Sequence, residues 1–248
     1  MLEGIDTSNL QGTPSNYAGQ WWYQQAQFVI VQAIPKGALT APQLYQAEGA
    51  GKYCGIYTWL WHTPSWRLGD QTVEGDQLAR LATVPDNAKL DMRPWLDVED
   101  NISDGWAAPG NSGRKDDVLR AFDALDTWAA GRGLPEAGIY TSQYFIDLLF
   151  GGDESFLDGR KRWLANYSAS AGGVIGGNVV AHQYTSDPVD RDVMLESEIV
   201  SGPSAADVLQ ALSYIDHDVL APLRSYKTGK VKAAVAEIDR VARQYGAA

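Results

Sequence analysis

The chain has 248 residues and a formal net charge of −11, from 31 acidic and 20 basic side chains. The acidic excess lies in residues 1–202, which carry −12, whereas residues 203–248 carry +1. This balance argues against docking on nucleic acid or on an anionic membrane, and the length suits one barrel-sized domain or a smaller domain with an appendage.

Short apolar runs alternate with helix-like stretches along the chain. Strands are expected at residues 4–7, 28–33, 55–61, 94–98, 137–141, 162–166, 179–184 and 190–194. Helices are expected at 42–51, 71–83 and 114–132, where apolar residues approach helical spacing. Alternating strands and helices predict βαβ units and a parallel sheet. Because the helices fade after the sixth strand, the pattern predicts an irregular TIM-like α/β barrel with about five βα units and three further strands.

Residues 203–248 differ from the rest of the chain. Ser204 to Asp207 resembles a capping box before a first helix, and a second apolar stripe runs from about Lys230 to Tyr245. We therefore expect a helical extension, appended to a barrel of residues 1–202. A packed extension is the favoured role, with a linker or an oligomerisation element as alternatives.

One predicted strand ends in two carboxylates, Asp97 and Glu99. Alternate side chains on a strand share a face, so the two point the same way. Two like charges held close disfavour double ionisation and raise one pKa, which gives a carboxyl group able to protonate a leaving glycosidic oxygen. In parallel barrels the active site lies at the carboxyl ends of the strands, where this pair falls. Taken alone, however, the pattern is more often a solvated strand end.

Three further strand ends strengthen this interpretation. Asp6 lies at the end of the first strand, and Asp190 lies near the last. The segment 162–167 ends the sixth strand with aromatic and amide groups, and the segment 182–186 precedes Asp190. Four acids at the ends of different strands would converge on one mouth of a barrel.

These segments together resemble the family 25 glycoside hydrolases, the Chalaropsis-type lysozymes common among bacteriophage endolysins. The Asp-x-Ser-x-x-Gln-Gly pattern is matched at 6–12 and the Asp-x-Glu pattern at 97–99. The Gly-Ile-Tyr-Thr-Ser, Trp-x-Ala-x-Tyr and Gln-Tyr-Thr-Ser elements are matched at 138–142, 163–167 and 183–186, followed by the acid at 190. The matches are in the family's order and span residues 4–194.

The resemblance implies cleavage of the β-1,4 bond between N-acetylmuramic acid and N-acetylglucosamine. Glu99 would be the acid/base, and Asp97 would orient the substrate N-acetyl group or stabilise positive charge at the anomeric carbon. Asp6 and Asp190 would complete an acidic cleft. A retaining, an inverting and a substrate-assisted route all stay open.

The chain departs from the family pattern in places. The usual Lys-Ala-Thr-Glu-Gly after the second strand and Tyr-His-Phe after the third are replaced by 32–37 and 57–62, and Asp192 stands where Asn is common. None of these changes removes a presumed catalytic carboxylate, but they put the accepted sugar modification in doubt.

Aromatic and amide side chains supply candidates for substrate binding. Tyr57, Trp59 and Trp61 alternate on one strand face, where they could stack on sugars or pack the barrel. The remaining candidates come from the matched elements: Tyr140, Trp163, Asn166, Tyr167 and Gln183.

No metal or cofactor is expected. The histidines His62, His182 and His217 are too scattered for a recognisable metal site, and the glycine-rich segment 172–177 lacks the context of a phosphate loop. The single cysteine, Cys54, lies in an apolar run and cannot form an internal disulfide.

The predicted function is thus peptidoglycan hydrolysis by a muramidase, with glycan strands as the partner and without membrane insertion. With neither a signal peptide nor a transmembrane span expected, the protein would be made in a host cytoplasm and would reach the wall as a phage endolysin or as a virion-associated lysin. The alternatives are a glycan-binding or virion structural module on the same barrel, and hydrolysis of another N-acetylated polysaccharide. The oligomeric state stays open.

Overall fold

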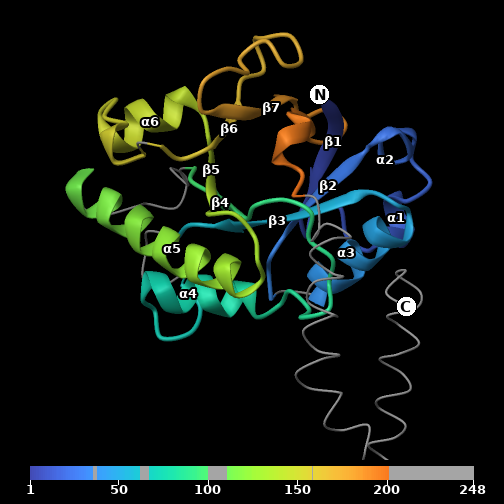
Figure 1. Cartoon of the computed structure of the whole chain (residues 1–248), viewed down its shortest axis with the longest axis horizontal. Coiled ribbons are helices and arrows are strands. Elements are labelled where there is room, and N and C mark those ends of the chain that lie inside the picture. Colours follow the sequence, from blue (N-terminus) through green and yellow to red (C-terminus); the bar gives the residue numbers. More distant parts are fainter. Residues whose placement is uncertain (36–37, 62–66, 100–110, 158, 201–248) are drawn as a thin grey trace, which may run out of the picture. The chain divides into compact units, whose positions relative to one another are not determined.

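The structure, a computed structural model, describes residues 1–35, 38–61, 67–99, 111–157 and 159–200 (Figure 1). Its strands are β1 (Leu2–Thr7), β2 (Phe28–Gln32), β3 (Tyr53–Trp59), β4 (Trp95–Asp97), β5 (Gly138–Thr141), β6 (Arg162–Ala165), β7 (Val179–Thr185) and β8 (Arg191–Met194). Its helices are α1 (Pro14–Tyr17), α2 (Trp21–Gln25), α3 (Thr40–Gly49), α4 (Val73–Leu81), α5 (Asn111–Gly131) and α6 (Gln143–Phe150), with 3-10 turns at Ser155–Leu157 and Glu196–Glu198. Residue contacts separate a unit Met1–Val200 from Ser201–Ala248, and the helices expected at 203–248 lie outside the described residues.

The strands close into a barrel in chain order, from β1 round to β8. The strands β1 to β7 are parallel to one another, whereas β8 is antiparallel to both β7 and β1. The predicted irregular barrel is confirmed, but the expectation of a parallel sheet is wrong at β8. A parallel return needs a crossover, and the connection 186–190 contains no helix, so the chain turns back directly.

The helices cover the outside of the barrel (Figure 1). Helix α3 packs on β2 and β3, and α4 and α5 pack on each other and on β3 and β4 respectively. Side-chain caps fix the starts of two helices. The Thr72 hydroxyl accepts a hydrogen bond from the Gly75 amide before α4, and the Ser142 hydroxyl accepts one from the Phe145 amide before α6. Helices α1, α2 and α6 were not among the expected helices, since α1 and α2 are too short to show a helical period.

Strand β3 ends two residues earlier than predicted. Its last paired residue is Trp59, opposite Asp97, the last residue of the short strand β4. One more backbone hydrogen bond, from the Leu60 amide to the Asp97 carbonyl, follows at 3.0 Å. Trp61 therefore lies beyond the strand, because β4 offers no further residue in the sheet for it to pair with.

The barrel has two distinct cores. The outer one is rich in aliphatic residues and joins strand residues such as Val29, Ile56 and Leu96 to helix residues such as Leu44 and Phe122. The inner one is drawn from alternate strand residues and contains large side chains: Phe28, Ile30, Tyr57, Met92, Trp95, Tyr140, Trp163 and Met194. Glycine makes room for these rings, because a Cβ at position 138 would lie 2.3 Å from the Trp95 ring.

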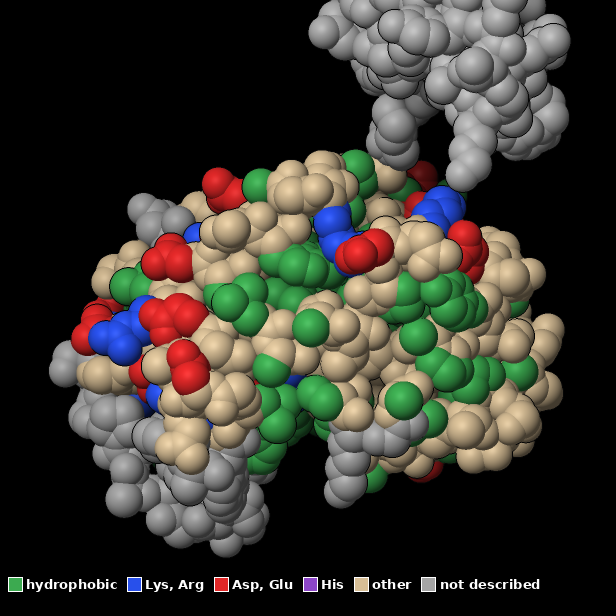
Figure 2. Space-filling model, turned by 90° about the horizontal axis from the view of Figure 1, so that it is seen from below, with side chains coloured by type: hydrophobic (Ala, Val, Ile, Leu, Met, Phe, Trp, Pro, Cys, Tyr) green, Lys and Arg blue, Asp and Glu red, His purple; other side chains and the backbone are tan. Residues whose placement is uncertain are grey.

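The surface bears on the expected partners. On the face seen in Figure 2, Lys and Arg side chains adjoin Asp and Glu side chains and do not gather into a basic patch. Within the described ranges, no helix combines the length and the apolar character that a membrane crossing requires.

Candidate active site

A cavity of about 300 Å³ opens at the carboxyl ends of the parallel strands. All four predicted acids line it, although they come from the start, the middle and the end of the described residues. The full lining is Asp6, Ser8, Asn9, Leu10, Gln32, Tyr57, Trp59, Asp97, Glu99, Tyr140, Trp163, Tyr167, Gln183 and Asp190. The sequence interpretation placed the four acids at or near strand ends, and closure of the barrel brings them together.

The carboxyl groups differ in burial. Asp6 and Asp97 are 5% and 3% exposed, whereas Glu99 and Asp190 are half-buried. Among the described residues that line the cavity, none is a Lys or an Arg. The cavity therefore concentrates four acids without a cation in its wall, which disfavours their simultaneous ionisation.

Burial is the main cause of the raised pKa values in this site. It raises the pKa of Glu99 to about 7, with a smaller contribution from the charge of Asp190 and an opposing one from a hydrogen bond with Tyr140. Burial also raises the pKa of Asp190 to about 6. The pKa values of Asp6 and Asp97 are well above the usual range, first because of burial and then because of neighbouring carboxylates. Glu99 is both accessible from the cavity and able to carry a proton near neutral pH.

Gln183 links three parts of the site. Its Oε1 accepts hydrogen bonds from the hydroxyls of Tyr140 at 2.7 Å and Tyr167 at 2.5 Å. Its Nε2 donates to Asp6 Oδ2 at 2.9 Å. The amide thus fixes the Asp6 carboxyl and the two phenols relative to one another, across strands β1, β5 and β7 and the segment after β6.

Asp97 offers an unused acceptor. Its Oδ1 is buried and has no hydrogen-bond partner among the described residues. The backbone beyond β4 is held by two hydrogen bonds, from the Val98 amide to the Tyr140 carbonyl at 2.9 Å and from the Thr141 hydroxyl to the Val98 carbonyl at 2.8 Å. An unsatisfied acceptor in a fixed position is costly unless a bound molecule supplies a donor.

Aromatic rings form the floor and one side of the cavity. Trp163 is fully buried and meets Tyr57 and Trp95 edge to face, at centroid distances of 6.4 and 5.8 Å. Trp59 lines the cavity and stacks on Trp61, with ring centroids 5.8 Å apart and planes 28° from parallel. Tyr167 is 56% exposed at the rim.

Most predicted binding residues lie in this lining, but two do not. Trp61 is not among the lining residues and stacks on Trp59. Asn166 turns its Oδ1 to the amide and hydroxyl of Ser168, at 3.1 and 2.7 Å. Trp163 contributes to the floor from the inner core, so its role is as much packing as binding.

The sequence interpretation did not single out several polar residues at the site, among them Ser8 and Asn9, which also line the cavity. Gln32, the last residue of β2, lines the cavity, and its buried Oε1 has no partner among the described residues. Asp192 was noted only as a departure from the family pattern; it is fully buried and accepts a hydrogen bond from Trp163 Nε1 at 2.9 Å. The alternation of β8 gave a signal for it, because Asp190 and Asp192 are two residues apart.

The described residues contain no group of three or more His, Cys, Asp or Glu side chains arranged to hold a metal ion. Of the histidines, His62 and His217 lie outside the described residues, and His182 is buried. The His182 ring contacts the Gly172 amide at 3.1 Å and the Asn166 carbonyl at 2.9 Å. Cys54 is a buried free thiol of the outer core.

Solved structures with the same fold include several lysozymes. The chain is similar to a family GH25 lysozyme from Aspergillus fumigatus, with a TM-score of 0.60 and 20% identity over 83% of this chain and 96% of that one. It is also similar to a muramidase from Acremonium alcalophilum, with a TM-score of 0.58 and 18% identity over 79% and 94% of the two chains. A third is a modular autolysin from Streptococcus pneumoniae in complex with a synthetic peptidoglycan ligand, with a TM-score of 0.58, 15% identity, and coverage of 78% of this chain and 46% of that one. No protein-family model and no curated protein matches the sequence.

Proposed function

We propose that this chain is a muramidase, which hydrolyses the β-1,4 bond between N-acetylmuramic acid and N-acetylglucosamine in peptidoglycan. One observation carries the proposal. Glu99 is a half-buried carboxyl with a pKa of about 7, in a cavity that it shares with three further acids at the carboxyl ends of barrel strands. General acids of glycoside hydrolases need such a protonated carboxyl group at working pH.

Glu99 is the better general acid of the pair that it forms with Asp97. Both pKa values are raised, but Glu99 is more accessible from the cavity whereas Asp97 is almost completely buried. Glu99 would donate its proton to the leaving glycosidic oxygen as the bond to the anomeric carbon breaks, and then take a proton from the incoming water.

Asp97 would act on the substrate through its unpaired Oδ1. The N-acetyl groups of the glycan carry an amide N–H, which matches this lone acceptor. A hydrogen bond there would orient the acetamido group beside the anomeric carbon, and negative charge on Asp97 would stabilise positive charge that develops in the transition state. Asp6, held by Gln183, and Asp190 would complete the acidic wall.

The cavity is suited to a sugar more than to a charged ligand. Its wall combines aromatic rings for sugar stacking with amide, hydroxyl and carboxyl groups for hydrogen bonds to hydroxyls. The names of the similar solved structures, a lysozyme, a muramidase and an autolysin with a peptidoglycan ligand, support the same substrate class. The proposed site of action is the bacterial cell wall, reached as an endolysin or virion-associated lysin, with residues 203–248 as an accessory extension.

The test is clearing of purified bacterial cell walls by the wild type, by Glu99→Gln and by a matched control, Glu196→Gln. Glu196 is an exposed carboxylate whose oxygen lies 3.6 Å from the N-terminal nitrogen, and it is not among the residues that line the cavity. We expect the wild type and Glu196→Gln to clear walls and to release fragments with new reducing ends at muramic acid, and Glu99→Gln to be inactive.

Two results would contradict the proposal. New reducing ends at N-acetylglucosamine would indicate a different glycosidase. Binding of all three proteins to walls, with no fragments released by any of them, would indicate a glycan-binding module on the same barrel.

A further inference from the structure

The stacked pair Trp59–Trp61 extends the aromatic surface beyond the cavity. Trp59 lines the cavity together with Asp97 and Glu99, and Trp61 stacks on its side, with ring centroids 5.8 Å apart. Both indoles are partly exposed. Flat indole faces bind the apolar faces of sugar rings. The second indole of this pair therefore adds stacking surface beyond that available to a sugar bound in the cavity.

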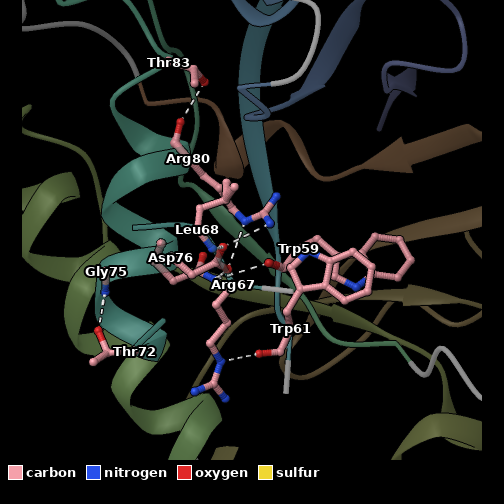
Figure 3. Close-up of polar contacts among 10 residues, drawn as sticks. Trp59, Trp61, Arg67, Leu68, Thr72, Gly75, Asp76, Arg80 and Thr83 are labelled. Carbon is pink, nitrogen blue, oxygen red and sulfur yellow. Dashed lines mark hydrogen bonds and ion pairs between the residues drawn. The ribbon is translucent and has the colours of Figure 1, made fainter. Parts of the chain in front are cut away.

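The backbone leaves the sheet between the two tryptophans. Strand β3 ends at Trp59, and the only strand hydrogen bond beyond it that the described residues show is the one from the Leu60 amide. Two side chains hold the carbonyls instead. Gln77 Nε2 donates to the Trp59 carbonyl at 3.2 Å, and Arg67 Nε donates to the Trp61 carbonyl at 2.7 Å. Figure 3 shows the Trp59 and Trp61 carbonyls facing α4 and the Arg67 side chain, while the indoles point away from the helix.

These two side chains are themselves fixed by buried polar contacts. Arg67 also pairs with Asp117 at 2.9 Å, and Gln77 also donates to Asp76 at 3.3 Å. Asp76 is bound in turn by Arg80, at 3.0 and 3.1 Å, and by the Leu68 amide at 2.9 Å (Figure 3). Asp76, Gln77 and Arg80 are all at most 3% exposed.

A buried ion pair of this kind is weak evidence for stability, because removing two charges from water offsets most of their attraction. What Asp76 and Arg80 do provide is a fixed orientation for Gln77 and for the chain at Leu68. Gln77 holds the Trp59 carbonyl, and Arg67, the residue before Leu68, holds the Trp61 carbonyl. The network therefore fixes the direction in which the two indole rings face.

We propose that Arg67 and Gln77 are positioning residues that hold Trp59 and Trp61 as a ledge for the glycan rings that follow a disaccharide bound at the cavity. The ligand is a glycan strand of at least three sugars, so this inference rests on the proposed function. Loss of Arg67 should weaken the binding of long glycans and leave that of short glycans, which occupy only the cavity, unchanged. Loss of Gln77, which holds Trp59 in the cavity wall, should weaken the binding of both, and that of long glycans more.

The test measures binding on a Glu99→Gln background, so that the probe is not cleaved. The probes are a disaccharide and a hexasaccharide of alternating N-acetylglucosamine and N-acetylmuramic acid, and the variants are Arg67→Met and Gln77→Met. The matched control is Arg132→Met. Arg132 also donates to backbone carbonyls, those of Pro85 and Val84, and also pairs with an aspartate, Asp86, but it is not among the residues that line the cavity.

We expect Arg67→Met to weaken binding of the hexasaccharide about tenfold, as loss of one stacked ring would, and to leave the Kd of the disaccharide unchanged. Gln77→Met should weaken binding of both probes, and that of the hexasaccharide more, because Trp59 also lines the cavity. Arg132→Met should change neither Kd, even where it lowers Tm as much as Arg67→Met does. In the parent protein with Glu99 restored, Arg67→Met should raise KM for cell walls and leave kcat unchanged.

A purely structural role would overturn the inference, and its signature is a lower Tm with both Kd values unchanged, or an equal change for both probes. A failure of the proposed function gives a different result. In that case Glu99-containing protein releases no sugar, while the hexasaccharide still binds more tightly than the disaccharide and the difference still depends on Arg67. A hexasaccharide that binds the parent protein no better than the disaccharide overturns the ledge, whatever the activity.

Discussion

The two ends of the barrel interior differ sharply, although the same strands build both. At the amino ends the interior is filled by apolar side chains such as Leu2, Phe28 and Met194. At the carboxyl ends it holds Asp6, Asp97, Glu99 and Asp190. The first half excludes water from below the second, so the apolar packing is itself a cause of the raised carboxyl pKa values. The apolar half of the interior therefore contributes to the chemistry of the acidic half. Substitutions in each half can test this contribution separately.

The largest effect is expected from removing charge at the acidic end. Asp97→Asn should lower kcat about 10²- to 10³-fold, because the amide keeps the shape but cannot stabilise developing positive charge as a carboxylate does. Turnover on purified cell walls measures this, with the exposed Asp123→Asn as control. If Asp97→Asn raises KM alone, Asp97 only binds substrate.

At the packed end, Trp163→Leu should lower the free energy of unfolding by about 3 kcal/mol. The substitution leaves a void among Tyr57, Trp95 and Tyr140 and removes the donor to the buried Asp192 carboxyl. Denaturant unfolding measures the change. A loss below about 1 kcal/mol would contradict the view that the inner core is tightly packed up to the cavity floor.

The pH dependence of activity links the two ends. Since Glu99 must be protonated to act as an acid and its pKa is about 7, activity should fall about tenfold per unit at pH values above it. Tyr140→Phe removes a hydrogen bond that lowers this pKa, so the alkaline limb should move to higher pH. Wall-clearing rates measured from about pH 5 to about pH 9, which covers the range over which such groups titrate, would show both changes. A shift of the alkaline limb to lower pH would contradict the assignment of this proton to Glu99.

The smallest expected effect is a pH-dependent change in Tm. The folded pKa of Asp190, about 6, lies above its usual 3.8, so the folded state binds the proton more tightly and loses this stabilisation as pH rises through 6. Asp190→Asn should therefore raise Tm relative to the wild type by a few degrees at pH 8, and by much less at pH 4.

Asp153 provides the opposite sign as a control. A hydrogen bond from Lys115 holds the pKa of this exposed carboxyl well below its usual range, so its stabilisation is present at neutral pH and is lost on acidification. Asp153→Asn should lower Tm at pH 8. Equal Tm changes for the two variants at pH 8 would mean that the cavity does not desolvate Asp190.

The sequence by itself determined that the chain forms a barrel and that four acids lie at or near its strand ends. Buried runs alternating with helices predicted the strands, and side-chain alternation placed Asp97 and Glu99 on one face at a strand end. Family-like segments in the right order added Asp6 and Asp190. These features depend on near neighbours in the chain, which is why local patterns carry them.

Only the tertiary structure decided the rest. The direction of β8 follows from a connection too short for a crossover. The end of β3 follows from the short length of its neighbour β4, which leaves Trp61 beyond the sheet, where Arg67 binds its carbonyl. The bond between Asp6 and Gln183 joins residues 177 positions apart, and exists because the barrel closes. The pKa of Glu99 likewise depends on how much water the surrounding chain excludes. Such distances and burial are set by packing between distant segments, so no local pattern contains them.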